Sequence, residues 1–152
     1  GGYYFESGKA TLRPEFVQKL RSTVIPLLRK YVDDYNIDVV EVIGHTDEVP
    51  MAGESNLDEK LIPALANSYP VEFLRSTDNA GLAIARAVAV VRVLRTDSRM
   101  KGVTVLPLSG AQLIVPIDRA ADGTATASDQ SRRRIEIRLR RSTEDVSAPR
   151  TP

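Results

Sequence analysis

The sequence predicts an α/β (α+β) fold, a two-layer sandwich with helices packed on a mixed sheet in the order β-α-β-α-β-β. Apolar residues recur every three or four positions in residues 16–31 and 82–94, which is typical of helices. Residues 37–43 and 102–108 are short apolar runs, typical of buried strands. Residues 134–140 alternate between apolar and charged, which predicts a half-buried strand inside the sheet or at one edge. Helices separated by strands favour two layers.

The first half of the chain begins with a predicted strand, Tyr3 to Phe5, which ends at Ser7-Gly8. A helix follows, and Pro14 beside Glu15 marks its first turn. Pro26 should kink or divide this helix near residues 22–25. The strand over residues 37–43 then ends in the loop composition Gly-His-Thr-Asp at 44–47. The apolar face expected for the helix consists of Phe16, Leu20, Val24, Leu27 and Tyr31.

The periodicity is poor over residues 48–78, and prolines are scattered through them. Residues 55–58 resemble a capping box that opens a short helix, which Pro63 interrupts. Most connections in compact domains have about 4–6 residues. We therefore expect residues 48–78 to be an insertion outside the core, with one or two short helices.

The second main helix has Asp78 or Asn79 as its cap. Arg86 lies on the same side of it as Leu82 and Val90, because these residues are four apart. Residues 120–130 have a loop composition, and residues 146–152 are expected to be a disordered tail. The prediction is thus one domain over residues 1–145. Its second helix should pack through Leu82, Ala85, Ala89, Val90, Val93 and Leu94.

Composition excludes several classes of function. The chain has 152 residues, 42% apolar and 27% charged, which is an ordinary globular mixture. A net charge of +1 gives no bulk field for nucleic acid or anionic lipid. The absence of Cys and the single His exclude thiolate chemistry and a multi-histidine metal site, so no metal and no cofactor are expected.

No segment approaches the length of a membrane span, and no signal peptide is evident. The chain opens abruptly at Gly1-Gly2-Tyr3, already strand-like. This start suggests a fragment of a longer protein, whose membrane anchor would lie outside this sequence.

Candidate catalytic groups are few. His45 and Asp47 stand two apart, but no Gly-x-Ser-x-Gly motif supplies the serine of a hydrolase triad. Glu6 and Asp47 are candidates for a carboxylate pair, although a loop acid more often caps a backbone group. The basic run Arg132-Arg133-Arg134 has two interpretations, a nucleic-acid surface or a solvated strand face, and the alternation favours the second. One of these arginines could instead point toward a ligand at the start of the strand.

Four motifs in order resemble the OmpA-like peptidoglycan-binding family. This family includes a porin's periplasmic domain, the peptidoglycan-associated lipoprotein and the flagellar stator B subunit. The resemblance covers about residues 3–141. The motifs are Phe5-Glu6-Ser7 with Leu12, then Gly44-His45-Thr46-Asp47, then Asn79, Leu82, Arg86, Ala87 and Val90, and finally Arg133-Arg134-Ile135-Glu136-Ile137.

The resemblance implies an OmpA-like fold and non-catalytic binding of meso-diaminopimelate in the stem peptide of peptidoglycan. Asp47 would accept from the ligand ammonium, and Arg86 would hold the carboxylate through its planar fork. Leu82 would form an apolar wall. Thr46 and Asn79 would add hydrogen bonds, and Phe5 with Glu6 would line the opposite side.

The resemblance also implies a partner and a location. The partner is peptidoglycan, with no nucleic acid and no membrane contact by this segment, and a homodimer is left open. The location is the periplasm of a Gram-negative cell, with attachment to the outer or inner membrane through a segment outside this chain. Alternatives are the periplasmic domain of a MotB-like stator, in a flagellar motor or a Zorya-type defence system, and a cell-wall hydrolase that uses Asp47 or Glu6.

Departures from the family pattern concern the rim of the site more than the fold. Ala83 stands where Ser is usual, and Arg132 stands where Asn is usual. The segment between Asp47 and Asn79 is far longer than is common in the family. Without the family, Asp47 and Arg86 would be interpreted as an internal salt bridge. His45 is expected to be structural, bonded to backbone and with no metal or catalytic role.

Overall fold

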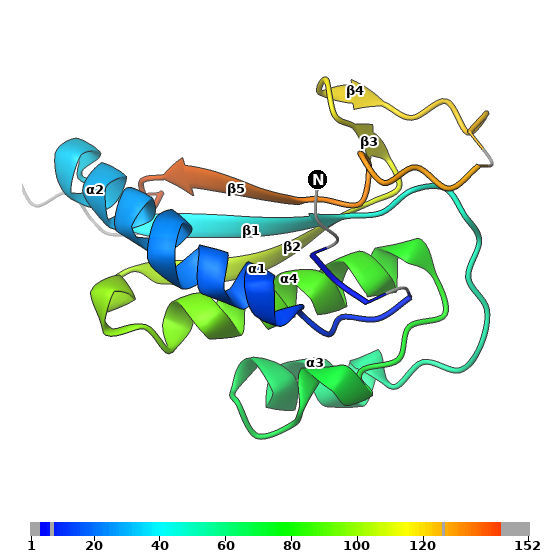
Figure 1. The fold of residues 1–152 in the computed structure, drawn as a ribbon, viewed down its shortest axis with the longest axis horizontal. Helices are drawn as coiled ribbons and strands as arrows, with labels where there is room; N and C mark the ends of the chain where they lie inside the picture. Colours follow the sequence, from blue (N-terminus) through cyan, green and yellow to red (C-terminus); the bar gives the residue numbers. More distant parts are fainter. Residues whose placement is uncertain (1–3, 7, 126, 144–152) are drawn as a thin grey trace, which may run out of the picture.

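A mixed sheet forms one layer of the molecule, as the sequence predicts, and among the described residues it has three strands in place of the four expected (Figure 1). The computed structural model describes residues 4–6, 8–125 and 127–143. The central strand β1 (Val39–His45) runs parallel to β2 (Thr104–Ala111) and antiparallel to β5 (Ile135–Arg140). β5 is an edge strand, in agreement with its alternating sequence.

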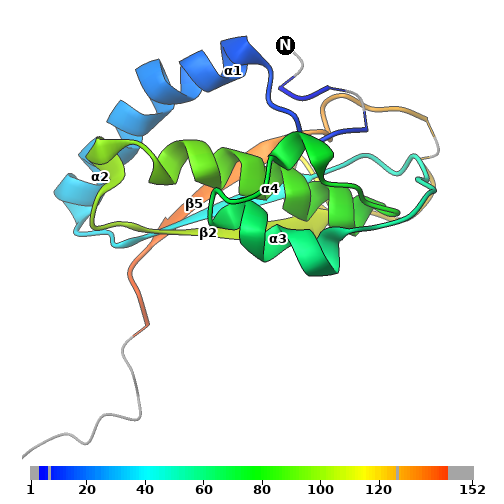
Figure 2. The ribbon, with the colours of Figure 1, turned by 90° about the horizontal axis from the view of Figure 1, so that it is seen from below.

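The helical layer covers one face of this sheet. Val40 and Val42 of β1 share a core cluster with the helix formed by residues 14–35 and with α4 (Asn79–Arg95). The apolar side chains of β5 pack against the same cluster. The two helices lie side by side in Figures 1 and 2. The structure is therefore the expected two-layer α+β sandwich.

A π-helical turn divides the first helix just before Pro26, where the sequence predicts a break. The order is α1 (Pro14–Lys19), the π turn η1 (Leu20–Val24) and α2 (Ile25–Tyr35). Pro14 stands at the start of α1 with Glu15 in its first turn, as expected. Pro26 has no N–H to continue the regular ladder, and its ring would meet the carbonyl oxygen four residues back, so a wider turn relieves the conflict.

The π turn overturns part of the predicted apolar face. Leu27 is 46% exposed and Tyr31 is 36% exposed, so they do not pack in the core as expected. Ile25, Leu28 and Val32 are buried instead, each one position later in the chain. The reason is geometric: a π turn takes up one more residue than an α turn, which shifts every following position around the axis.

Helix α4 is buried on nearly all sides. Asp78 is its cap, and its side chain accepts a hydrogen bond of 2.6 Å from the Gly81 N–H. The close approach of α4 to β1 requires Gly44, because a Cβ there would lie 2.0 Å from the Ala83 carbonyl oxygen. This contact fixes the start of α4 beside the end of β1.

Residues 48–78 carry α3 (Leu57–Leu65) and a short 3₁₀ turn η2 (Val71–Phe73), on the side of α4 away from α1 (Figure 2). Pro63 lies inside α3 and does not interrupt it, contrary to expectation. Ser55 accepts from the Leu57 N–H at 3.2 Å, while Asn56 is the cap position. Leu57, Ala64 and Leu74 form a second apolar cluster with Ala85 and Val88 of α4.

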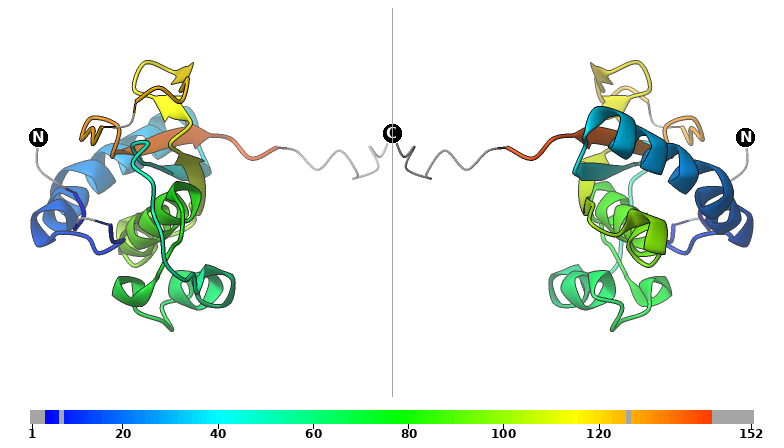
Figure 3. Two further views of the ribbon diagram at one scale, coloured as in Figure 1. Left: turned by 90° about the vertical axis from the view of Figure 1, so that its right-hand side faces the viewer. Right: turned by 90° about the vertical axis from the view of Figure 1, so that its left-hand side faces the viewer.

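The remaining segments are short. A 3₁₀ turn η3 (Ser98–Met100) leads into β2, and β3 (Ile114–Val115) with β4 (Arg119–Ala120) makes a small hairpin on the side opposite α3 (Figure 3). The predicted first strand is a single bridge between Phe5 and Leu12, and Tyr3 lies outside the described residues. The predicted tail, residues 146–152, also lies outside them. No helix among the described residues is long and apolar enough to cross a membrane.

Candidate functional site

A cleft of about 280 Å³ opens where β1 ends and α4 begins. The topology brings three more segments to this place: the N-terminal loop, the chain after β1, and the approach to β5 (Figure 1). Its polar lining holds two guanidinium groups and one carboxylate. The lining residues are Gly8, Thr46, Asp47, Val49, Pro50, Met51, Asn79, Leu82, Arg86, Ser128 and Arg133.

Asp47 follows β1 by two residues and is only 6% exposed. Its Oδ2 accepts from Arg133 Nε at 2.8 Å and from the Asp129 backbone N–H at 3.1 Å. The segment that precedes β5 therefore holds this carboxylate in place, because both of its donors bond to the same Asp47 oxygen.

Arg86 enters the cleft from the second turn of α4 and is 3% exposed. Its Nε donates to the Lys9 carbonyl oxygen at 3.0 Å, and its guanidinium carbon lies 4.9 Å from the centre of the Phe5 ring. None of the ion pairs formed among the described residues includes Arg86. The salt bridge to Asp47, which is the simpler interpretation of the sequence, is thus not formed.

The electrostatics of Arg86 follow from this arrangement. Burial, and then the charge of Arg133, lower the pKa of Arg86 to about 10, while Asp47 opposes the shift. The group stays protonated at neutral pH. Among the described residues it is a buried cation that lacks a carboxylate partner, and such a charge is costly unless an anion compensates it.

Arg133 is the third charged group of the cleft, and it is not among the ligand-binding residues that the sequence predicts. It belongs to the basic run 132–134, of which one member could face a ligand, and Arg133 lines the cleft. Its side chain is 26% exposed, and it also donates to Ser128 Oγ. Because it precedes β5 by two residues, strand alternation alone could not tell which way it points.

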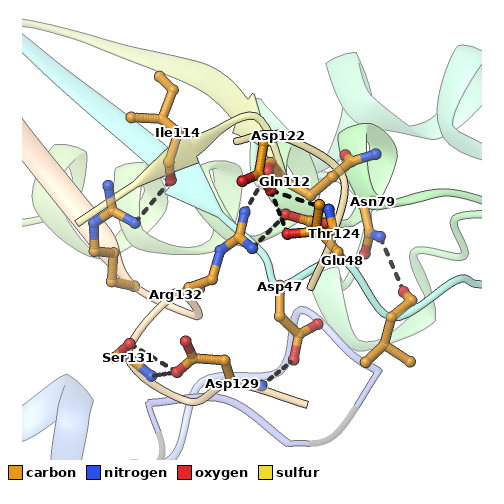
Figure 4. A network of polar contacts seen from close by, with 12 residues as sticks. Asp47, Glu48, Asn79, Gln112, Ile114, Asp122, Thr124, Asp129, Ser131 and Arg132 are labelled. Atoms are coloured by element: carbon orange, nitrogen blue, oxygen red, sulfur yellow. Dashed lines mark hydrogen bonds and ion pairs between the residues drawn. The ribbon is translucent and has the colours of Figure 1, made fainter. Parts of the chain in front are cut away.

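A buried ion pair supports the loops that carry these groups. Arg132 Nη1 lies 2.5 Å from Glu48 Oε1, and both side chains are buried. Arg132 Nη2 donates to the Gln112 carbonyl oxygen at 2.6 Å, and Figure 4 shows both contacts of the guanidinium. Arg132 and Glu48 adjoin Arg133 and Asp47 in the chain, so the pair fixes both sides of the cleft at once.

Apolar and uncharged polar groups complete the cleft. Leu82 forms its wall one turn before Arg86, with Val49 to Met51 from the start of the insertion nearby. Asn79 Nδ2 donates to the Val49 carbonyl oxygen at 3.0 Å, which ties the insertion to α4. Thr46 is buried beside Asp47.

The structure brings five of the seven predicted ligand-binding residues into one cleft: Thr46, Asp47, Asn79, Leu82 and Arg86. Phe5 lies beneath the Arg86 guanidinium in the core and is absent from the lining. Glu6 pairs with Lys9 at 2.9 Å on the exposed surface and does not line the cleft.

His45 is the last residue of β1 and is fully buried. Its Nε2 lies 3.1 Å from Glu136 Oε2 on β5, so its partner is a side chain, whereas the sequence predicts a backbone partner. Since the carboxylate can only accept, this geometry assigns the proton to Nε2. His45 does not line the cleft and cannot serve as its general base.

The chemistry available in the cleft is recognition of opposite charges. Asp47 is the one acidic residue in the lining formed by the described residues, so a pair of carboxylates of the glycosidase type is not assembled there. No group of three or more metal-ligating side chains occurs among the described residues. Guanidinium and carboxylate groups in one partly apolar pocket suit a ligand that bears both an ammonium and a carboxylate.

No known family profile matches the chain, and no curated protein matches it. Among solved structures, the chain is similar to a crystal structure of a MotB-like protein from Desulfovibrio vulgaris, with 18% sequence identity and a TM-score of 0.49. The similarity covers 91% of this chain and 70% of that chain.

Proposed function

We propose that this cleft binds the free end of meso-diaminopimelate in the peptidoglycan stem peptide. The chain would then act as a non-catalytic anchor that joins a membrane-attached protein to the cell wall in the periplasm. The four motifs that resemble OmpA-like domains support this proposal, since the residues they supply for binding include Asp47 and Arg86. In this proposal, nucleic acid, metal ions and cofactors take no part in ligand binding.

The observation that carries the proposal is the state of Arg86. A guanidinium that is 3% exposed and has no acidic partner among the described residues is aimed into an open cleft. A ligand carboxylate would supply the missing anion and take two parallel hydrogen bonds from the planar fork. The ligand ammonium, on the same carbon as that carboxylate, would then bond to Asp47. Leu82 would contact the apolar stem.

Substitution of either charged group tests the proposal. Asp47→Asn and Arg86→Lys keep nearly the original size, so each removes a charge or the fork with little change in packing. Loss of one partner of a desolvated charge pair costs about 2–5 kcal/mol, or roughly 30-fold to several thousand-fold in affinity. We expect losses in this range for Asp47→Asn. Arg86→Lys should also lose much of the affinity, because an ammonium cannot hold both carboxylate oxygens.

The measurement is calorimetric titration with purified muropeptides that contain meso-diaminopimelate, with a thermal melt of each variant. Asp33→Asn and Arg29→Lys are the matched controls, because these residues form an ion pair on the exposed side of α2. Wild-type affinity in both cleft variants would contradict the proposal. Asp47 would then serve only as the internal partner of Arg133.

A further inference from the structure

We propose that Arg133 is a specificity-determining residue. It makes the cleft prefer a ligand with a free carboxylate to the same ligand in which that carboxylate is amidated. This inference rests on the proposed function and deepens it, because it names the chemical form of the ligand that the cleft accepts. It starts from the ion pair between Arg133 and Asp47. In the proposed function Asp47 binds the ligand ammonium, yet the protein already supplies this carboxylate with a cation.

The first step concerns the charge of the cleft. Arg133 Nε lies 2.8 Å from Asp47 Oδ2, and its Nη2 donates to Ser128 Oγ. Asp47 is therefore compensated from within, whereas Arg86 has no acidic partner among the described residues. The three ionised groups in the lining are Asp47, Arg86 and Arg133, whose charges of −1, +1 and +1 add to +1.

The second step concerns what this charge does to a ligand. A group with one ammonium and one carboxylate has no net charge, and its carboxylate faces two guanidinium groups. Its amide has a net charge of +1 and enters a cleft that already carries +1. Like charges repel more strongly in a partly desolvated cleft than in water. In addition, Arg133 competes with the ammonium for Asp47, so the ammonium alone gains little.

The third step is that Arg133 is held at a position where its charge acts on both Asp47 and Arg86. The Asp129 N–H bonds to the same Asp47 oxygen at 3.1 Å, and the adjacent Arg132 is anchored on Glu48. Arg133 is also close enough to Arg86 to lower the pKa of Arg86 by its charge, second only to burial. Its guanidinium thus contacts the anion of the cleft and lines the same cleft as the other cation.

The experiment compares two ligands on each variant. The ligands are a muropeptide that contains meso-diaminopimelate and the same muropeptide amidated at the carboxylate that Arg86 would hold. We expect the wild type to prefer the free carboxylate, and Arg133→Gln to lower this preference by on the order of tenfold. Most of the change should come from tighter binding of the amide. Arg133→Lys keeps the charge and should keep most of the preference.

Arg138→Gln is the matched control, because Arg138 is an exposed arginine of β5 outside the cleft. It should leave the preference unchanged. If Arg133→Gln does not melt cooperatively, Arg133→Met removes the same charge and gives the same comparison. An unchanged preference in the neutral variant, with both ligands still bound by the wild type, would overturn this inference alone. Failure of the wild type to bind either ligand would overturn the proposed function as well.

Discussion

Single residues at the end of β1 decide how close the sheet and α4 approach. Gly44 is required because its missing side chain leaves room for the Ala83 carbonyl oxygen. The next residue, His45, points away from α4 and fills the space beside Gly110, where an added Cβ would lie 2.5 Å from the imidazole. The chain then enters the cleft with Thr46 and Asp47. A glycine and a buried imidazole thus hold the start of the cleft segment, Thr46 and Asp47, in position.

His45 should make the stability of the protein depend on pH. Burial, and then the charge of Arg134, lower the pKa of His45 below its ordinary value of 6.5, against the hydrogen bond to Glu136. Arg138 also lowers it. The unfolded chain therefore binds a proton at a higher pH than the folded chain. The contribution of His45 is complete above about pH 6.5 and is lost as the pH falls through the folded-state pKa.

We expect the melting temperature of the wild type to fall between pH 7 and pH 5, and His45→Gln to show a flatter pH profile. This window is suited to His45 because it is the single histidine, and the carboxyl groups whose pKa values the fold lowers, such as Asp97 at about 2, titrate below it. Thermal melts at constant ionic strength make the measurement. A wild-type stability that rises toward pH 5 would show that the bond to Glu136 outweighs burial.

At the scale of elements, the π turn decides which side of the first helix is buried. The buried residues follow the spacing Phe16, Leu20, Ile25, Leu28 and Val32, with one step of five across the turn. Removal of one residue there would restore steps of three and four throughout. Pro26 must change in the same variant, because a proline inside a regular helix costs about 3 kcal/mol.

We therefore expect deletion of Thr23 combined with Pro26→Ala to fold with at least wild-type stability. Deletion of Lys30 from the regular part of α2 is the matched control. It would rotate the following residues by about 100° and turn the buried Val32 toward water. This should cost about 1.5–3 kcal/mol. Urea unfolding of both variants makes the comparison, and equal losses in the two would show that the π turn has no effect on register.

At the scale of the whole molecule, we propose one domain over residues 1–145, with an insertion at about residues 48–78. The described residues form two apolar clusters, one between the sheet and the helices and one between α4 and the insertion, and Leu65 and Val71 of the insertion pack against both. Asn56 closes the insertion, because its side chain bonds to the Phe73 carbonyl oxygen at 2.9 Å and to the Arg75 N–H at 2.8 Å. The insertion is thus tied at its base and packed on α4.

Replacement of residues 53–75 by a short Gly/Ser linker tests this division. The change keeps the cleft residues Val49 to Met51 and the cap Asp78. We expect one cooperative transition to remain, with stability lower by about 2–5 kcal/mol, since the burial of Leu57 and Leu74 is lost. The linker itself should cost little entropy.

Leu57→Ala is the companion variant, because it weakens the second cluster and leaves the segment in place. It should cost about 2–5 kcal/mol and also keep a single transition. Chemical unfolding followed by circular dichroism measures both. If the linker variant lost cooperative unfolding, the insertion would belong to the main core and the proposed division would be wrong.

Local sequence patterns were enough to predict the main elements and five residues that line the cleft. Periodicity of 3.6 and of two is a local property, so the three strands of the main sheet, the two main helices and the Asp78 cap could be predicted from nearby residues. The order of the motifs along the chain was enough to assign Thr46, Asp47, Asn79, Leu82 and Arg86 to one site. Pro26 likewise indicated where the first helix would break.

The buried side of α2 and the pairing of the charged side chains could not be predicted from the sequence, because both depend on how the elements pack. The side of α2 that is buried depends on one extra residue in a π turn, and composition does not record a turn type. The pairing of Asp47 with Arg133 instead of Arg86, and of His45 with Glu136, depends on strand register across about 90 residues of chain. Such contacts follow from how the elements pack, because charged side chains take whichever opposite charge the fold places nearest.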